Sequence, residues 1–281
     1  NSEKLRVTQI LDFLRRHHFL SCAAMMIKFV IMEKPIKDYK YFLKDTIRLQ
    51  VDFSQTAQSR GLAPPPLQKP CAAEAEKIPL PPARDWQTIQ PVSVVDAIAR
   101  RQSRRAATKG DMPLAELSFL LWATQGIRQQ AGPYNALRTV PSAGCRHAFE
   151  TYIAAFRVKG LEKAIYRYLP LSHELVKEKA PENLEQTVTR MAMGQSFAGK
   201  SAATFIWTTI PARMEWRYAE ASYKVIALDA GHVCQNLYLA CEAAGCGTCA
   251  IAAYDQEYCD KILGIDGQQE FTIYMAPVGK I

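Results

Sequence analysis

The sequence predicts an α+β fold, because helical and strand patterns are interleaved after residue 86 without a regular βαβ period. An apolar stripe with helical spacing follows Pro113, and runs rich in aromatic and β-branched residues cover 149–158, 204–209 and 271–278. Apolar residues make up 48% of the chain and charged residues 22%, as in an ordinary globular protein. A chain of 281 residues is long enough for one or two domains.

The prolines divide the chain into two parts. Residues 1–60 are basic and helix-prone, with apolar residues three and four apart. Prolines are dense in 61–85, where they remove amide donors and disfavour both helices and central strands. We therefore expect 1–85 to be an N-terminal helical extension with a proline-rich arm, and 86–281 to be the main domain.

Helix boundaries are marked at three places in the main domain. Ser93 is positioned as an N-cap whose hydroxyl accepts from a free helix amide. Pro113 opens an apolar helical stripe that ends at Gly126. Asp229 is expected to cap a long helix that ends at Gly245, where a left-handed glycine commonly stops a helix.

The cysteines favour a reducing, cytoplasmic compartment, because eight in 281 residues are too few for a disulfide scaffold. Cys246 and Cys249 form a CxxC in a small-residue turn that precedes a predicted short strand at 249–254. A zinc site needs four ligands, and the sequence has no second CxxC and no paired histidines, so we expect no metal. The CxxC follows a helix rather than opening one, which disfavours a thioredoxin-like site but leaves redox activity open.

The net charge of +8 favours an anionic ligand. Its densest cluster, Arg100–Arg105, has two interpretations: a phosphate site, or the solvated C-terminal end of a basic helix. A non-enzymatic nucleic-acid-binding module that uses 1–60 and this cluster is a remote alternative, because the cluster lacks interleaved aromatic residues. No apolar run reaches the ~18 residues of a membrane span, so no membrane partner is expected.

Four blocks, taken in order, resemble the FMN-dependent nitroreductase superfamily over roughly 86–281. They are Arg101-Gln102-Ser103-Arg104-Arg105, Pro141-Ser142-Ala143-Gly144, the run from Gly245 to Asp255, and Pro277-Val278-Gly279-Lys280. Three further segments, 117–127, 139–144 and 229–237, are similar to the SagB/ThcOx-type subfamily, which includes azoline dehydrogenases of peptide synthesis. Each block alone is a weak signal, and their common order makes the resemblance specific.

The resemblance implies a nitroreductase-like fold with a mixed central sheet flanked by helices, FMN as cofactor, and an intertwined homodimer with its sites at the subunit interface. It assigns the phosphate to Arg101, Ser103, Arg105 and Lys280, and the flavin ring or ribityl chain to the second and third blocks. The full expected set is Arg101, Gln102, Ser103, Arg105, Pro141, Ser142, Ala143, Gly144, Ala250, Ile251, Ala252, Ala253 and Lys280. Many family members have Glu-Gly where this chain has Ala252-Ala253, so only backbone contacts are expected there.

The function expected from the resemblance is hydride transfer from NAD(P)H, or an organic donor, to a second substrate of the nitro or quinone type. The alternative is a SagB/ThcOx-like dehydrogenase or oxidase that acts with partner proteins on a peptide-derived heterocycle. Characterised members of that subfamily have a Lys-Tyr pair where this chain has Arg217-Tyr218. Arginine is a poor general base, which leaves Tyr218 as the candidate catalytic residue.

Overall fold

The computed structural model describes residues 40–107 and 110–281. Residues 52–281 form one compact unit, and the described residues 40–51 lie outside it. Within 40–51, the chain forms a 3-10 helix at Thr46–Leu49. The helical pattern predicted for residues 1–39 lies outside the described residues.

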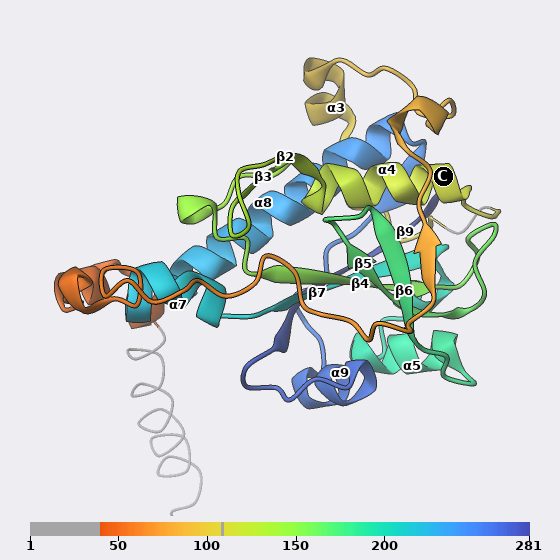
Figure 1. The fold of residues 1–281 in the computed structure, drawn as a ribbon. Helices are drawn as coiled ribbons and strands as arrows, with labels where there is room; N and C mark the ends of the chain where they lie inside the picture. Colours follow the sequence, from red (N-terminus) through yellow and green to blue (C-terminus); the bar gives the residue numbers. More distant parts are fainter. Residues whose placement is uncertain (1–39, 108–109) are drawn as a thin grey trace, which may run out of the picture. The chain divides into compact units, whose positions relative to one another are not determined.

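A seven-stranded sheet forms the centre of the 52–281 unit (Figure 1), in the order β1-β6-β5-β4-β7-β9-β8. Pairs of neighbouring strands are antiparallel, and parallel pairing occurs only in isolated bridges of the described chain. The strands are β1 (Lys77–Pro79), β4 (Phe149–Ala155), β5 (Ala164–Leu169), β6 (Glu174–Lys179), β7 (Ala203–Thr209), β8 (Cys246–Thr248) and β9 (Phe271–Lys280). A separate hairpin joins β2 (Ile127–Gln130) to β3 (Ala136–Arg138).

Helices cover both faces of this sheet, which confirms the α+β prediction. They are α3 (Val94–Arg100), α4 (Leu114–Gln125), α5 (Leu184–Met191), α6 (Phe197–Lys200), α7 (Ala212–Tyr218), α8 (Ser222–Ala243) and α9 (Gln256–Leu263). In Figure 1, α4 and α8 lie above the sheet, and α5 and α9 lie below it.

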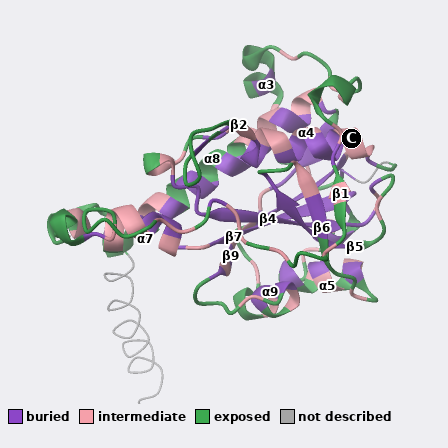
Figure 2. Ribbon diagram, viewed as in Figure 1, coloured by how far each residue is buried: buried purple, intermediate pink, exposed green. Residues whose placement is uncertain are grey.

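Two apolar cores result, because successive strand side chains point to opposite faces. On β7, Phe205 and Trp207 join the core under α4 and α8, while Ile206 joins the core over α5 and α9. Figure 2 shows the sheet as the buried layer between the helices. Every residue of β4 and β7 is buried.

Most predicted element boundaries are confirmed. Ser93 Oγ accepts from the Asp96 amide at 3.1 Å, and α4 runs from Pro113 as N-cap to Gly126 as C-cap. Gly245 is left-handed, with φ of 58°. The predicted role of Asp229 is wrong, because α8 begins seven residues earlier at Ser222 and leaves Asp229 buried within the helix.

The strand predicted at 249–254 is also wrong. The paired residues are Cys246–Thr248, because these lie opposite the last residues of β9, with Cys246 paired to Lys280. Beyond Thr248 the chain leaves the sheet, and Ile251 makes only an isolated bridge to Met275.

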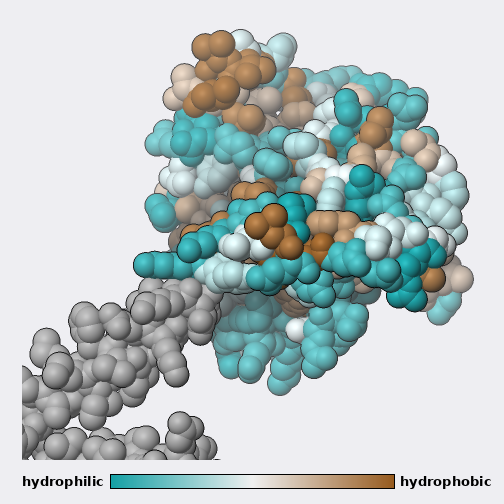
Figure 3. Space-filling model, turned by 90° about the vertical axis from the view of Figure 1, so that its left-hand side faces the viewer, coloured by the Kyte–Doolittle hydropathy of each residue, from teal (hydrophilic) through white to brown (hydrophobic). Residues whose placement is uncertain are grey.

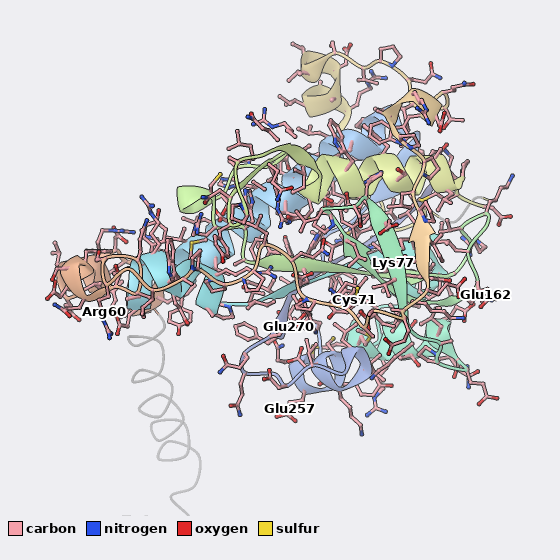
Figure 4. All side chains as sticks on the ribbon, in the orientation of Figure 1. Arg60, Cys71, Lys77, Glu162, Glu257 and Glu270 are labelled. Carbon is pink, nitrogen blue, oxygen red and sulfur yellow. The ribbon has the colours of Figure 1, made fainter. Side chains whose placement is uncertain are left out.

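Two buried arginines, Arg213 of α7 and Arg167 of β5, bind the proline-rich arm. Arg213 Nε donates to the Pro66 carbonyl at 2.9 Å, and Arg167 donates to the carbonyls of Lys69 and Pro70 at 2.8 and 3.0 Å. Because prolines have no amide to donate, the arm bonds chiefly through its carbonyls. Figure 4 labels Cys71, which directly follows Pro70, and Glu270. The Glu270 carboxylate lies 2.5 Å from Lys69 Nζ, so Lys69 of the arm is also held by an ion pair.

None of the described helices is both long enough and apolar enough to cross a membrane.

Candidate functional site

The first, third and last predicted blocks meet at one edge of the sheet. Ser103 forms a parallel bridge with Thr248, and the Arg104 amide donates to the Thr248 carbonyl at 2.8 Å. Lys280 pairs with Cys246 in the β8–β9 ladder. Residues separated by more than 140 positions in the sequence are therefore neighbours, as a shared ligand would require.

The arginines of the first block differ in their partners. Arg104 forms a 2.6 Å ion pair with Glu242 of α8. Arg101 lies over the Tyr238 ring at 5.3 Å, and Arg105 lies over the Phe197 ring at 5.9 Å. Within 40–107 and 110–281, neither Arg101 nor Arg105 forms an ion pair with a carboxylate. The two arginines that the family motif assigns to phosphate are thus the two whose charge is not neutralised.

Lys280 has a different environment. Its Nζ lies 3.0 and 2.9 Å from the two Glu116 carboxylate oxygens and 2.7 Å from the Ala244 carbonyl. Glu116 belongs to α4 and is buried. Since an ammonium has three protons, these three bonds use all of them, and a direct phosphate contact would require one to break.

Tyr238 of α8 connects the first and third blocks and was not predicted. Its Oη accepts from the Ala250 amide at 2.8 Å and lies 3.0 Å from Ser103 Oγ. In the sequence it is one of several residues on a helical stripe, and the only available signal was general: a half-buried tyrosine usually bonds through its hydroxyl.

The second block is held elsewhere on α8. The Ala143 amide donates to Asp229 Oδ2 at 3.2 Å, and Ser142 Oγ accepts from the His147 amide at 2.9 Å. Burial raises the pKa of Asp229, while hydrogen bonds from Ser142 and Ala143 oppose that rise. The loop backbone is unusual, because Gly144, Cys145 and His147 all have positive φ. Such strain in non-glycine residues is often found at functional sites.

Arg217 and Tyr218 lie against this second block. A Cβ placed on Gly144 would be 2.7 Å from both Arg217 Cδ and Tyr218 Oη. The Arg217 guanidinium lies 5.6 Å from the centre of the Tyr218 ring. The structure therefore brings the candidate catalytic Tyr218 to the second block.

The second block contacts α8 at a different place from the first and third blocks. The first contact on α8 is Asp229 and the second is Tyr238, nine residues later. At 1.5 Å per helical residue, this separates the two clusters by roughly 13 Å along the helix.

The remaining predicted residues have individual positions. Gln102 and Ala252 are exposed, Ile251 is buried, and the Ala253 carbonyl accepts from Gln195 Nε2 at 3.1 Å. Pro141 lines a cavity of about 320 Å³ together with Arg128, Arg138, Ser142, Cys145 and His147, among others. A larger open groove of about 910 Å³, lined by α5 and α6, contains none of the predicted site residues.

Cys246 of the CxxC is not activated by its surroundings. Burial raises the pKa of Cys246 to about 12, so the group is a thiol at neutral pH. The described cysteines are all free.

The environment of the first block fits a phosphate group. Two guanidiniums have no carboxylate partner, the Ser103 hydroxyl is exposed, and the buried Thr248 hydroxyl has no hydrogen-bond partner in the described part of the chain. Charged and hydroxyl donors of this kind are the usual ligands of a dianion.

Comparisons with known proteins identify the family. Residues 98–280 match the model of the nitroreductase family. A protein of Methanocaldococcus jannaschii named as a nitroreductase is 28% identical over 192 residues, covering 68% of this chain and 93% of that protein. The trifolitoxin-processing protein TfxB of Rhizobium leguminosarum is 26% identical over 157 residues, covering 53% of this chain and 41% of that protein.

Solved structures share the fold. A Ralstonia eutropha structure described as a nitroreductase has a TM-score of 0.60 and 25% identity, covering 78% of this chain and 95% of that one. A chain of the Escherichia coli microcin synthetase McbBCD complex has a TM-score of 0.53 and 18% identity, covering 80% and 90%. The similarity to TfxB agrees with the SagB-type resemblance.

Proposed function

Because the chain belongs to the nitroreductase family, we propose that it is an FMN-dependent oxidoreductase that transfers hydride from NAD(P)H, or an organic donor, to a second substrate of the nitro or quinone type. The observation that supports the proposal is the bridge between Ser103 and Thr248, which joins the first and third blocks. Arg101 and Arg105 flank Ser103 in the sequence, and neither forms an ion pair with a carboxylate of the described residues. FMN supplies the redox chemistry when bound, and the protein supplies position and electrostatics.

In this proposal Arg101, Arg105 and Ser103 hold the phosphate. Each charge-assisted bond contributes roughly 1.5–3 kcal/mol. The Arg104–Glu242 ion pair fixes the segment between them. Lys280 secures the end of β9 through Glu116, and it reaches the phosphate only if one of its three hydrogen bonds breaks.

We further propose that two copies of the chain pair and share the sites. The second block contacts α8 at Asp229, and the first and third blocks contact it at Tyr238, roughly 13 Å further along the helix. In this proposal the second copy would supply its own second block to the site. Exposed apolar residues support such pairing: Val94 and Val95 of α3 are 71% and 76% exposed, and Leu228 of α8 is 56% exposed. Figure 3 shows a brown patch over α3 at the top of the molecule.

The other residues then have limited roles. The segment Ala250–Ala253 would present backbone groups to the ring edge. Tyr218 Oη would hold or donate a proton to a substrate near the Ser142–Gly144 turn, because it already lies against Gly144. The free described cysteines support the predicted reducing, cytoplasmic location.

Cofactor content and donor reaction test the proposal. The purified protein should be yellow, or become so on adding FMN, and anaerobic NAD(P)H should bleach the flavin absorbance. Size-exclusion with light scattering should give a dimer. A colourless protein that does not bind added FMN would contradict the proposal that FMN is the cofactor.

A second candidate is a dehydrogenase or oxidase of a peptide-derived heterocycle that acts with partner proteins. The similarity to TfxB and the position of Arg217-Tyr218 beside the second block favour it. It predicts that NAD(P)H fails as a donor and that Tyr218→Phe abolishes turnover of the heterocycle while FMN binding is retained. Activity with NAD(P)H that persists in Tyr218→Phe would exclude it.

A further inference from the structure

Tyr238 makes three contacts with the proposed cofactor residues. Its hydroxyl accepts from the Ala250 amide at 2.8 Å and lies 3.0 Å from Ser103 Oγ, and its ring lies under the Arg101 guanidinium at 5.3 Å. Ala250 belongs to the third block, whereas Ser103 and Arg101 belong to the first. No other side chain in the described residues hydrogen-bonds to both Ser103 and Ala250.

The direction of the hydrogen bonds follows from the groups at the two ends. An amide can only donate, so Tyr238 Oη is an acceptor for Ala250. A phosphate dianion can only accept, so a Ser103 hydroxyl that contacts it must donate its proton to it. Ser103 Oγ then accepts from Tyr238, whose own proton points to it.

We propose that Tyr238 is a positioning residue that makes Ser103 a phosphate donor and holds Arg101 beside it. The bonds run in one direction, from the Ala250 amide through Tyr238 Oη to Ser103 Oγ and on to the phosphate. In such a chain each bond polarises the next. The proposal rests on FMN binding as proposed above, and it adds a residue that contacts no reacting atom.

The test compares FMN with riboflavin, which lacks the phosphate, by titration with fluorescence quenching. Tyr238→Phe removes the hydroxyl and keeps the ring. We expect it to weaken FMN binding roughly tenfold, because the Ser103 hydroxyl that Tyr238 aligns makes a hydrogen bond to a charged group. Riboflavin affinity should stay within about twofold, because Tyr238 acts through the phosphate.

Two further variants separate positioning from folding. Ser103→Ala should weaken FMN binding to a similar degree, and the Tyr238→Phe/Ser103→Ala pair should lose little more than either single variant. Tyr238→Leu also removes the ring beneath Arg101 and should lose more. Tyr166→Phe is the matched control, since among the described residues the Tyr166 hydroxyl bonds only the Glu162 carbonyl, and β5 lies away from this edge.

The outcomes are distinct. Unchanged FMN affinity in Tyr238→Phe, or an equal loss for FMN and riboflavin, would overturn the role of Tyr238 while leaving the FMN assignment intact. Additive losses in the double variant would also overturn it. If the wild-type protein binds no FMN, the proposed function fails, and this inference fails with it.

Discussion

The Nζ atom of Lys280 lies within 3.0 Å of both carboxylate oxygens of Glu116, a buried residue 164 positions earlier in the chain. This pair joins the last residue of β9 to α4. It also gives a sequence-predicted phosphate ligand an internal partner.

Lys280→Met should therefore act mainly on stability. It leaves the Glu116 carboxylate buried without a cation, which costs about 3 kcal/mol in the free energy of unfolding. Urea unfolding measures that loss, and FMN affinity of the folded protein should change by no more than about threefold. If Lys280→Met instead weakens FMN binding as strongly as an arginine variant and leaves stability unchanged, Lys280 is a direct phosphate ligand.

Arg101→Gln and Arg105→Gln should weaken FMN binding without a matching loss of stability. Neither arginine has a carboxylate partner within the described residues, so its charge is available to the phosphate. We expect each change to reduce FMN affinity by roughly tenfold or more and to leave riboflavin binding unchanged. Arg100→Gln is the control, because Arg100 belongs to the same cluster but lies 4.0 Å from Asp96 and is largely exposed. An equal loss of FMN affinity in Arg100→Gln would indicate that the net charge of the cluster, rather than a direct contact, controls binding.

Gly144→Ala should disturb the contact between the second block and Arg217-Tyr218. The new Cβ would meet Arg217 Cδ and Tyr218 Oη at 2.7 Å, and φ is +56°. Gly132→Ala is a matched control, with φ of +87° and no atom within 4 Å of the new Cβ. We expect Gly144→Ala to lose at least about 1 kcal/mol more than Gly132→Ala, because overpacking adds to backbone strain. Similar losses of unfolding free energy in the two variants, measured with denaturant, would mean that Arg217 and Tyr218 move away from the new Cβ at little cost.

The lowered pKa of His147 predicts that the free energy of unfolding depends on pH. Burial, helped by the charges of Arg138 and Arg146, lowers its pKa from 6.5 to about 3. Between these values the unfolded chain binds a proton that the folded protein does not, so stability should fall as pH decreases below about 6.5. One such group contributes a slope of up to about 1.4 kcal/mol per pH unit.

His147→Gln should make this slope shallower between pH 6.5 and 4, as measured by urea unfolding at several pH values. Some slope will persist, because burial also lowers the pKa of His173. An unchanged slope in His147→Gln would show that other groups control acid stability.

The local signals in the sequence identified several elements correctly. The Ser93 cap, the Pro113-to-Gly126 helix and the β7 strand depend on neighbouring residues and on periodicity, which a sequence displays directly. Strands β5 and β6 were missed because charged residues interrupt their apolar pattern. Arg167 of β5, for example, is 2% exposed and bonds to the arm and to Glu178.

Residue types alone left the Arg100–Arg105 cluster open between a phosphate site and the solvated end of a basic helix. The resemblance to the nitroreductase family assigned Arg101, Ser103, Arg105 and Lys280 to a phosphate, and that assignment stays a prediction. Which cations are available was decided by packing: Glu242 neutralises Arg104 and Glu116 neutralises Lys280 across 138 and 164 residues of chain. Packing also places the Tyr238 hydroxyl between Ser103 and Ala250, where it contacts both. Contacts between distant residues depend on how helices and strands pack in three dimensions, and no local pattern of residues records that.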